Sequence, residues 1–412
     1  MNGKHPGKIL FFLLLALCLY AARACADEAE NLTSECVFEL SANRAQVNSI
    51  TDGDYRTYWS SDKQWEPYVK IRSETPVRGL YLCFRTMPDS YRILDGEGSL
   101  LAEGDTRFHH VFYPLDGATD IEIRVPKGEK KATLGFNEIF VFGAGEIPGW
   151  IQRWEEPYEK ADILFFSTHP DDELLFMGGA IATGSLADHR NIQVVYFTSS
   201  NTTRRSEALN GLWTLGLRHY PEFGPFSDQY PPSGLMKDAY NAAKGKKDGV
   251  WSWMTGIIRK YRPEVVVTHA EKGEYGHPQH RMVADSAKAC FERAADADVY
   301  PESACAFGAW QVKKLYLHLY GDEAEQTRFD FTVPREEFGG LTANELAQKA
   351  YEQHVTQAGK GNTFNGKLVP FSVEEYGVKR YPANRFGLYA STVGPDILHD
   401  DFMENIPADG EP

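Results

Sequence analysis

The stretch ILFFSTHPDDE, residues 163–173, decides the fold of the larger part of this chain. It opens with four apolar residues, the pattern of a strand that is buried on both faces of a sheet. Further short apolar runs lie at residues 194–197, 265–267 and 315–319. Segments with the pattern of helices lie between these runs, at residues 174–187, 204–215, 249–260 and 280–294. Strands that alternate with helices predict an α/β domain with a mostly parallel sheet covered on both faces.

The part of the chain before this stretch, residues 35–143, has a different periodicity. Apolar and polar residues alternate there in short segments separated by turn residues, for example at 68–71, 79–83, 121–125 and 138–142. A period of two over short segments, without a long helical stretch, is typical of an antiparallel β-sandwich. We therefore expect a β-sandwich domain before the α/β domain.

A glycine- and proline-rich segment, GAGEIPG at residues 143–149, separates the two patterns and indicates a linker. After residue 330 the pattern is less regular, with one clear helix at 343–354. We expect these parts: a β-sandwich at 27–145, a linker at 146–158, the α/β domain at 159–330 and its C-terminal extension at 331–412.

Composition excludes several classes of protein. With 412 residues, 42% of them hydrophobic and 25% charged, the chain has the make-up of a folded globular protein rather than a disordered one. The formal net charge of −15 argues against nucleic acid as a partner, because phosphate-binding surfaces need an excess of Lys and Arg. After residue 26, no stretch is long and apolar enough to predict a transmembrane helix.

The first 26 residues have the features of a cleaved secretory signal. Lys4 and Lys8 precede an apolar run at residues 9–20, and Ala-Cys-Ala at 24–26 supplies a small-residue cleavage site before Asp27. The apolar run is shorter than the ~20 residues that a membrane-spanning helix needs. A lipid-modified cysteine at position 25 is a weaker alternative, because the residues before it lack an aliphatic side chain. We expect a secreted or periplasmic protein.

Four cysteines remain after such cleavage: Cys36, Cys83, Cys290 and Cys305. An even number in an exported protein permits two disulfides. If the two domains fold separately, pairing within each domain, Cys36 with Cys83 and Cys290 with Cys305, is the natural arrangement. Buried thiols are the alternative. None of the spacings is typical of a metal site built from thiolates.

Polar residues follow the first predicted strand of the α/β domain, in the segment THPDDE at 168–173. Ligands of open α/β sheets bind outside the carboxyl ends of the strands, so this segment lies where chemistry is expected. His169 and Asp172 are three residues apart at a turn that enters a helix, which can direct both side chains at one zinc ion. Asp171 points differently and remains available to act on a bound water.

A second motif, GEYGHPQH at residues 273–280, follows the predicted strand at 265–267. It also lies at a carboxyl end and can reach the same edge of the sheet. His280 would complete a three-ligand zinc site with an open position for water, which is the arrangement of catalytic zinc. His277 would lie on the substrate side as a proton donor or electrostatic helper. Simple capping of a helix by acidic residues, and a pair of surface histidines, are the alternatives for the two motifs.

Together the two motifs resemble the signatures of the zinc-dependent LmbE-like (PIG-L) de-N-acetylases. Arg204-x-x-Glu207, followed by Leu215-Gly216, is similar to the helix between those signatures in the family. The resemblance covers about residues 160–320 and implies a Rossmann-like fold. It implies these roles: zinc ligands His169, Asp172 and His280, general base Asp171 and helper His277.

Two departures from the family pattern concern the substrate. The segment YFTSSN at 196–201 lacks the Gly-Glu that often follows the second strand, and the insert at 220–249 has no counterpart. The role of Arg204 also stays open. Its guanidinium could bind a hydroxyl or an anionic group of a substrate, or it could pair with Glu207 at i,i+3 on a solvated helix.

In the N-terminal domain, residues 50–61 (ITDGDYRTYWSS) resemble the opening of discoidin-like (galactose-binding-like) β-sandwich domains, and residues 137–143 resemble their closing strand. The resemblance implies glycan binding and a structural calcium ion held by oxygen ligands. The ligands would be Asp52, the Thr57 carbonyl and Glu138. Alternatively, Asp52 begins an ordinary tight turn. Trp59 is expected in the core, whereas Trp65 or Tyr91 could form a platform for a sugar.

These features predict a secreted zinc-dependent hydrolase that removes acetyl groups from N-acetylated amino sugars or glycans. Zinc would lower the pKa of a water molecule, Asp171 would take its proton, and Asp171 or His277 would protonate the leaving amine. Two alternatives stay open. The chain could be a non-catalytic glycan-binding surface protein, or a metal-dependent hydrolase of another amide or an ester.

Overall fold

The computed structural model describes residues 27–198, 201–228 and 249–407. The chain divides into two compact units, Met1–Ile151 and Gln152–Pro412. The division falls inside the segment 146–158 that composition indicates as a linker. The predicted signal at 1–26 and most of the insert at 220–249 lie outside the described residues. Within the described part of the chain, no helix is both long enough and apolar enough to cross a bilayer.

The described residues of the first unit form one antiparallel sheet of seven strands in the order β2-β7-β3-β6-β4-β5, with β1 paired to β3. The antiparallel class agrees with the alternating sequence pattern. The strands are β1 Val37–Leu40, β2 Trp59–Ser60, β3 Tyr68–Thr86, β4 Ser90–Asp95, β5 Leu100–Asp105, β6 His110–Arg124 and β7 Gly135–Phe142.

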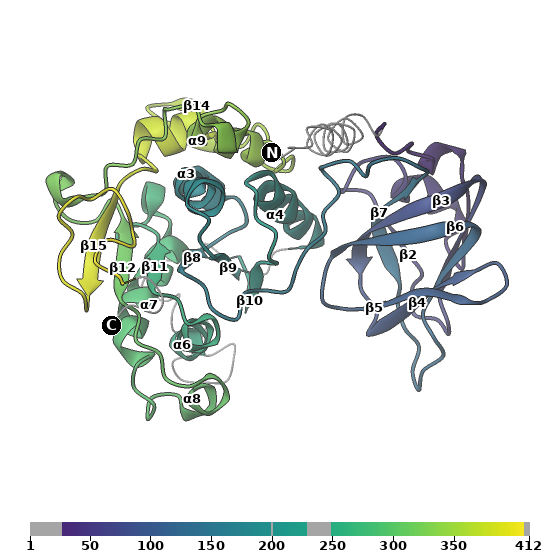
Figure 1. Ribbon diagram of the computed structural model, residues 1–412, viewed down its shortest axis with the longest axis horizontal. Helices are drawn as coiled ribbons and strands as arrows, with labels where there is room; N and C mark the ends of the chain where they lie inside the picture. The colour runs from purple at the N-terminus through teal and green to yellow at the C-terminus, as the bar shows by residue number, and fades with distance from the viewer. Residues whose placement is uncertain (1–26, 199–200, 229–248, 408–412) are drawn as a thin grey trace, which may run out of the picture. The chain divides into compact units, whose positions relative to one another are not determined.

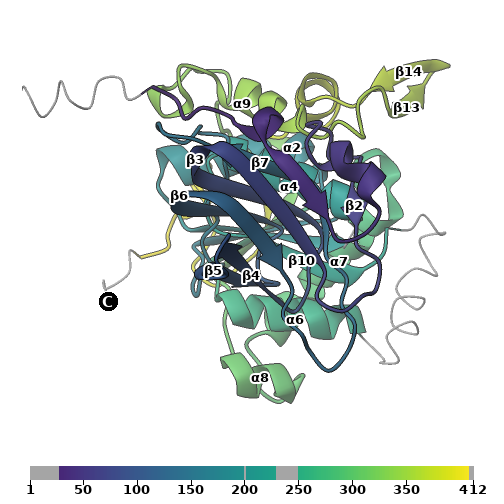
Figure 2. The same ribbon diagram turned by 90° about the vertical axis from the view of Figure 1, so that its right-hand side faces the viewer.

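The long strand β3 combines two predicted strands, 68–71 and 79–83, in one element of 19 residues. It lies between β6 and β7, and Figure 2 shows these strands side by side. Its register with β6 shifts between Arg72 and Val77 and again before Gly79. Such irregularities bend a strand, which lets a long strand fold over a core. Because hydrogen bonds join all seven strands in one sheet, the two-layer sandwich stays a prediction.

Burial in the first unit distinguishes the aromatic residues of the core from those that could contact a sugar. Trp59 is fully buried, as expected, and its indole N–H donates to the carbonyl of Ala42 at 2.8 Å. Tyr91 is also buried, and its hydroxyl lies 2.7 Å from that of Tyr113, so the prediction of Tyr91 as a sugar platform is wrong. Trp65 is 49% exposed and is the one of these candidates that can meet a ligand.

The second unit holds a six-stranded sheet in the order β10-β9-β8-β11-β12-β15. The first five strands are parallel, and β15 is antiparallel to β12. Strand order reverses at β8, since β9 follows it on one side and β11 lies on the other. The strands are β8 Ile163–Ser167, β9 Ile192–Thr198, β10 Glu222–Phe226, β11 Val265–Thr268, β12 Lys314–His318 and β15 Phe386–Ser391.

Helices lie on both faces of this sheet (Figure 1). One face carries α3, α4 and α9, with α9 in contact with both α3 and α4, and the other carries α6, α7 and α8. The helices are α2 Asp172–Phe176, α3 Gly178–Ala182, α4 Thr202–Thr214, α6 Gly249–Tyr261, α7 Pro278–Arg293, α8 Pro301–Phe307 and α9 Ala343–Tyr351, with a two-stranded hairpin, β13 Gly361–Phe364 and β14 Lys367–Pro370, after α9.

Three elements differ from the sequence prediction. The single helix predicted at 174–187 is broken at Met177, whose φ of −137° is not helical, into α2, α3 and a π-helical turn at Thr183–Ala187. Strand β10 lies in the insert and contains Gly-Pro, which masks an edge strand in sequence. Strand β15 lies in the extension that showed no regular pattern.

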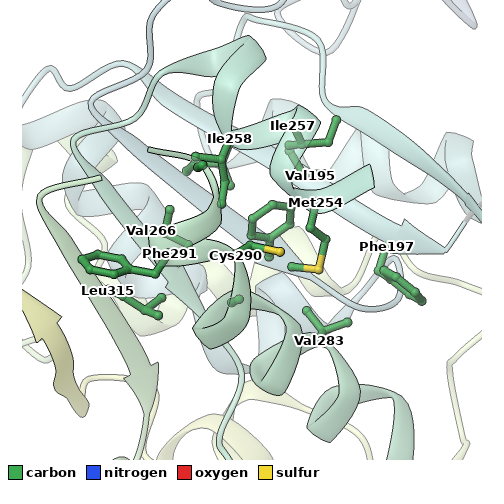
Figure 3. Packing of buried hydrophobic residues seen from close by; sticks show 14 of the residues in the cluster. Val195, Phe197, Met254, Ile257, Ile258, Val266, Val283, Cys290, Phe291 and Leu315 are labelled. Atoms are coloured by element: carbon green, nitrogen blue, oxygen red, sulfur yellow. The ribbon is translucent and has the colours of Figure 1, made fainter. Parts of the chain in front are cut away.

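The core between the sheet and α6 and α7 is continuous and apolar. Figure 3 shows Met254, Ile257 and Ile258 of α6 together with Val283, Cys290 and Phe291 of α7, packed near Val195, Val266 and Leu315 of the strands. This packing fixes α7 against β11 and β12. The start of α7, which carries the second motif, is thereby held at the carboxyl ends of the strands.

The predicted disulfides are absent: none of the four cysteines in the described residues is in a disulfide. Cys83 packs with Tyr81, whereas Cys36 packs with the cluster that contains Leu82. Because side chains alternate along a strand, Cys83 and Leu82 point to opposite faces of β3, and Cys36 is on the wrong side for pairing. Cys290 is buried in the apolar core, whereas Cys305 is exposed.

Candidate active site and metal centre

The two sequence motifs meet at the edge of the second sheet. β8 and β11 are parallel neighbours, so the loops after them start side by side at the point where strand order reverses. The Asp172 Oδ2 atom lies 2.8 Å from Nδ1 of His169 and 3.1 Å from Nε2 of His280. All three side chains are buried. The structure therefore brings together the three residues that the sequence predicts as metal ligands.

The backbone of the first motif forms a tight turn before α2. The amide of His169 donates to Asp172 Oδ2 at 2.9 Å, which folds that carboxylate back over the turn. Asp171 has a φ of 131°, a conformation that is rarely populated by residues other than glycine. Such strain persists only where the surroundings enforce it, and it concentrates at functional sites. The amide of Asp171 donates to Glu173 Oε2 at 2.9 Å, which contributes to holding the strained turn.

The second motif is organised by the start of α7. Pro278 occupies the first turn, where its missing N–H costs no hydrogen bond, and His277 is the N-cap. The Nδ1 atom of His277 accepts the amide N–H of Gln279 at 3.2 Å. Nδ1 is therefore unprotonated, and in the neutral ring Nε2 carries the proton. His280, one turn into the helix, is fully buried and directed at Asp172.

A buried carboxylate, Glu274, lies behind His280. It accepts hydrogen bonds from Nδ1 of His280 at 2.7 Å, from Nδ1 of His269 at 2.8 Å and from Nδ1 of His318 at 2.7 Å. No feature of the sequence indicates a role for Glu274, although it lies in the second motif. Since His269 and His318 lie at the ends of β11 and β12, only the strand order reveals that three histidines share this acid.

The electrostatics of the site favour a cation. Burial alone would lower the pKa values of His169 and His280, but the Asp172 carboxylate raises them to about 10 and about 9. Burial would raise the pKa of Asp172, yet the two histidines bring it well below its ordinary range. Without a metal ion, protons on the two histidine rings thus compensate the buried negative charge of Asp172. A bound metal ion would take over that role. Metal binding would release these protons.

The donor set fits zinc. Imidazole nitrogen and carboxylate oxygen are ordinary zinc ligands, and Nε2 of His280 is buried without a hydrogen-bond partner among the described residues. Among the described residues, two groups of side chains could each hold a metal ion, because within each group all ligand atoms lie within 4.8 Å of one another. The first group is His169, His277 and His280, and the second is Asp172, His269 and His280. In the second set, Nε2 of His269 already accepts the amide N–H of Thr168 at 2.9 Å and Nδ1 faces Glu274, so His269 has no nitrogen to offer.

Asp171 and Arg204 form a pair at the rim of this cluster. Arg204 lies with Nη2 2.9 Å from Asp171 Oδ1, donates to the carbonyl of Pro170 and lies 3.5 Å from Glu207. Burial raises the pKa of Asp171 to about 6, although Arg204 opposes the shift. The i,i+3 pair with Glu207 is present, but it is buried rather than solvated. Thr356 donates to the Glu207 carboxylate from its amide at 2.6 Å and from its hydroxyl at 2.7 Å.

Further side chains near the site had no signal in the sequence. Tyr196 donates to Glu173 at 2.8 Å, and burial raises the pKa of Glu173 to about 8. From α9, Tyr351 is buried with a hydroxyl that lacks a partner among the described residues. Burial raises the pKa of the Tyr351 hydroxyl, and the negative charge of Asp171 raises it further. The extension after residue 331 therefore contributes to the surroundings of Asp171.

In the first unit, the three predicted calcium ligands are only partly brought together. Asp52 accepts the hydroxyl of Thr57 at 3.0 Å, while the Thr57 carbonyl accepts from Asn137 at 3.0 Å. Glu138 is fully buried, and within the described part of the chain neither of its carboxylate oxygens has a well-formed hydrogen bond. Burial and the neighbouring Asp52 carboxyl raise the pKa of Glu138 to about 8.

Residues 164–291 match the family model PIG-L, described as GlcNAc-PI de-N-acetylase. The second unit contains a PIG-L domain. The PIG-L domain extends from β8 into α7 and includes both motifs, whereas β12, α9 and β15 lie beyond the matched residues.

Curated proteins are similar to the same region. A 1D-myo-inositol 2-acetamido-2-deoxy-alpha-D-glucopyranoside deacetylase of Frankia casuarinae is 27% identical over 194 residues, which are 41% of this chain and 62% of that enzyme. The mycothiol S-conjugate amidase of Streptomyces coelicolor is 44% identical over 176 residues, which are 36% of this chain and 57% of that enzyme. The chain thus spans about three fifths of the length of the curated relatives that it matches.

Among solved structures, N,N'-diacetylchitobiose deacetylase from Pyrococcus horikoshii is similar, with 19% identity and a TM-score of 0.38. The match covers 56% of this chain and 85% of that one.

Proposed function

We propose that this chain is a secreted zinc-dependent hydrolase that removes acetyl groups from N-acetylated amino sugars or glycans. The observation that carries the proposal is the buried contact of Asp172 with both His169 and His280, with Asp171 at its rim. The match of residues 164–291 to PIG-L supports it, as do the deacetylase and amidase activities for which the Frankia and Streptomyces relatives are named. The signal-like sequence at 1–26 supports export.

His169, Asp172 and His280 would hold the zinc ion. Bound zinc supplies Lewis-acid chemistry, by which it acidifies water and polarises an amide carbonyl. Asp171 takes the proton of the attacking water, since a buried carboxyl with a raised pKa is a better base than an exposed one. Arg204 holds the Asp171 carboxylate in place through its 2.9 Å contact.

His277 acts on the substrate side. Its Nδ1 accepts a backbone N–H, so its Nε2–H can donate to the substrate carbonyl as negative charge develops there, or to the leaving amine. This hydrogen-bond arrangement disfavours His277 as a zinc ligand, although its nitrogen lies within reach of His169 and His280. Asp171, once protonated, is the other donor for the amine, and the products are acetate and a free amino sugar.

The proposal is tested by measuring acetate release from a panel of N-acetylated mono- and oligosaccharides with zinc-loaded protein. Amides that carry larger acyl groups and a thiol-conjugate amide belong in the same panel, because one relative is an amidase of a mycothiol conjugate. Release of acetate that stops after chelation and returns with zinc supports a de-N-acetylase. Cleavage of only the other amides would show that the enzyme is specific for an acyl group other than acetyl. If zinc-loaded protein cleaves none of these compounds, the proposal that the chain is a hydrolase is refuted.

We propose further that the first unit binds calcium through Asp52, Thr57 and Glu138 and presents Trp65 to glycans. Without a cation, the raised pKa of Glu138 means that the folded state holds a proton that the unfolded state releases. The contribution of this proton to the stability of the unit is therefore fully present below about pH 4.5 and is lost as the pH rises toward 8. Calcium would replace that proton and restore the lost stability.

Calcium is accordingly expected to raise the unfolding temperature of the first unit at pH 8 by several degrees and to have little effect near pH 4.5. A ligand at 100 times its Kd stabilises by about 2.7 kcal/mol, which corresponds to about 5–15 °C for a domain of this size. Calorimetry with calcium or chelator measures the shift. Glu138→Gln should abolish it, whereas Glu103→Gln, a matched change at an exposed ion pair, should not. Equal midpoints with and without calcium at pH 8 would remove the site.

A further inference from the structure

Glu274 is a fully buried acid whose carboxylate accepts four hydrogen bonds. Its Oε2 atom accepts from Nδ1 of His269 and Nδ1 of His280, and its Oε1 atom accepts from Nδ1 of His318 and from the amide of Ala270 at 3.0 Å. A carboxylate has about four lone-pair sites, so this one is saturated. The saturation matters because a buried charge is costly unless every site is satisfied.

The partners of these rings show which nitrogen carries a proton. The Nε2 atom of His269 accepts the amide N–H of Thr168 at 2.9 Å, so its proton must be on Nδ1, facing Glu274. His318 faces acceptors with both nitrogens, Glu274 at 2.7 Å and the carbonyl of Pro382 at 3.1 Å. His269 therefore donates to Glu274 from Nδ1, and His318 lies between two acceptor oxygens.

His280 is the remaining member of the cluster and the one that reaches the metal site. Its Nδ1 donates to Glu274 at 2.7 Å, and its Nε2 lies 3.1 Å from Asp172 without a hydrogen bond. Because Glu274 holds a proton on Nδ1, Nε2 is the nitrogen of His280 that can bind a metal ion, and it faces Asp172. Hydrogen bonding of the far nitrogen to a carboxylate also makes the near nitrogen a stronger ligand.

We propose that Glu274 is the positioning residue of the metal centre, which fixes the tautomer and orientation of His280 and anchors it to the ends of β11 and β12 through His269 and His318. The inference rests on the proposed metal site but not on the identity of the substrate. It predicts a defined effect on metal affinity, because the loss of such a partner typically weakens binding 10- to 100-fold.

Glu274→Gln is the decisive variant, because an amide keeps the volume but replaces two acceptor positions by N–H donors. If the amide nitrogen takes the place of Oε2, it faces Nδ1–H of His269 and His280, and His280 has to move its proton to Nε2, where the metal binds. If it takes the place of Oε1, it faces Nδ1 of His318 and the N–H of Ala270, and the anchor to the end of β12 is lost. The variant should bind zinc 10- to 100-fold more weakly in a chelator competition, and its Co²⁺ absorption bands should shift. Glu274→Asp keeps the charge but shortens the reach, and should show a smaller loss.

Asp396→Asn is the matched control, because Asp396 is another buried acid, after the end of β15, bound by Lys314 and Tyr316 of β12 rather than by histidines. It should keep the affinity for zinc and the Co²⁺ spectrum. Circular dichroism establishes folding before titration. If Glu274→Gln does not fold, Glu274→Asp carries the test, and a wild-type zinc affinity in a folded variant overturns the inference. An equal loss in Asp396→Asn also overturns it.

The outcome is separable from that for the proposed function. Metal affinity and the Co²⁺ spectrum are measured without substrate, so wild-type protein that binds zinc yet releases no acetate would refute the deacetylase while Glu274 could still be tested. Conversely, an active deacetylase whose Glu274→Gln variant binds zinc as tightly as wild type would refute only the positioning role.

Discussion

Asp171→Asn is expected to fold, to retain zinc and to lose a factor of about 10²–10⁴ in the rate of acetate release. The amide keeps the volume of the side chain and can still accept a hydrogen bond from Arg204, but it cannot take a proton from water. The strained backbone at this position should persist, since it is held by Glu173 rather than by the Asp171 side chain. Steady-state kinetics and zinc content of the purified variant measure both effects.

A conservative change at a neighbouring acid provides the control for Asp171→Asn. Glu207→Gln removes a buried carboxylate that contacts Arg204 but not the water side of the site, so it should cost less activity than Asp171→Asn. Activity of Asp171→Asn equal to wild type would show that another group is the base. Loss of zinc from that variant would show instead that Asp171 is a ligand.

His169→Ala, Asp172→Ala and His280→Ala are each expected to lose most of their zinc and all measurable activity, because each removes one of only three protein ligands. Asp172→Ala should have the largest effect on the protein, since its Oδ2 atom contacts both histidines and its loss removes the carboxylate that the two buried rings share. Metal analysis after dialysis and activity with added zinc measure the outcome.

His277→Ala separates the two ligand sets that geometry allows. If His277 acts only on the substrate, the variant keeps zinc at wild-type stoichiometry and loses less activity than Asp171→Asn. If the zinc ligands are His169, His277 and His280, the variant loses zinc, and Asp172→Ala retains it. Zinc content of this pair of variants therefore decides the ligand set whatever the substrate is.

The sequence alone was enough for the local parts of the fold and the site. Apolar runs such as 163–166 and 265–267 form strands because a strand buried on both faces has no alternative to continuous apolar side chains. The contact between His169 and Asp172 follows from a three-residue spacing at a turn, which is a local geometric matter. Trp59 is buried for the same kind of reason, since it is a large apolar group at the start of a short strand.

Tertiary structure decided what depends on distant residues meeting. Strand order places β11 beside β8 and β12 beside β11, and only this order brings His269 and His318 to Glu274. Burial decided the state of Asp171 and Glu138, because removal from water raises the pKa of an acid by an amount that composition and spacing do not encode. Cys83 shows the same limit, since its separation from Cys36 depends on which face of β3 each cysteine meets. Sequence spacing therefore determined which residues could serve the site, while packing determined which side chains orient and charge them, because hydrogen bonds and desolvation depend on three-dimensional neighbours.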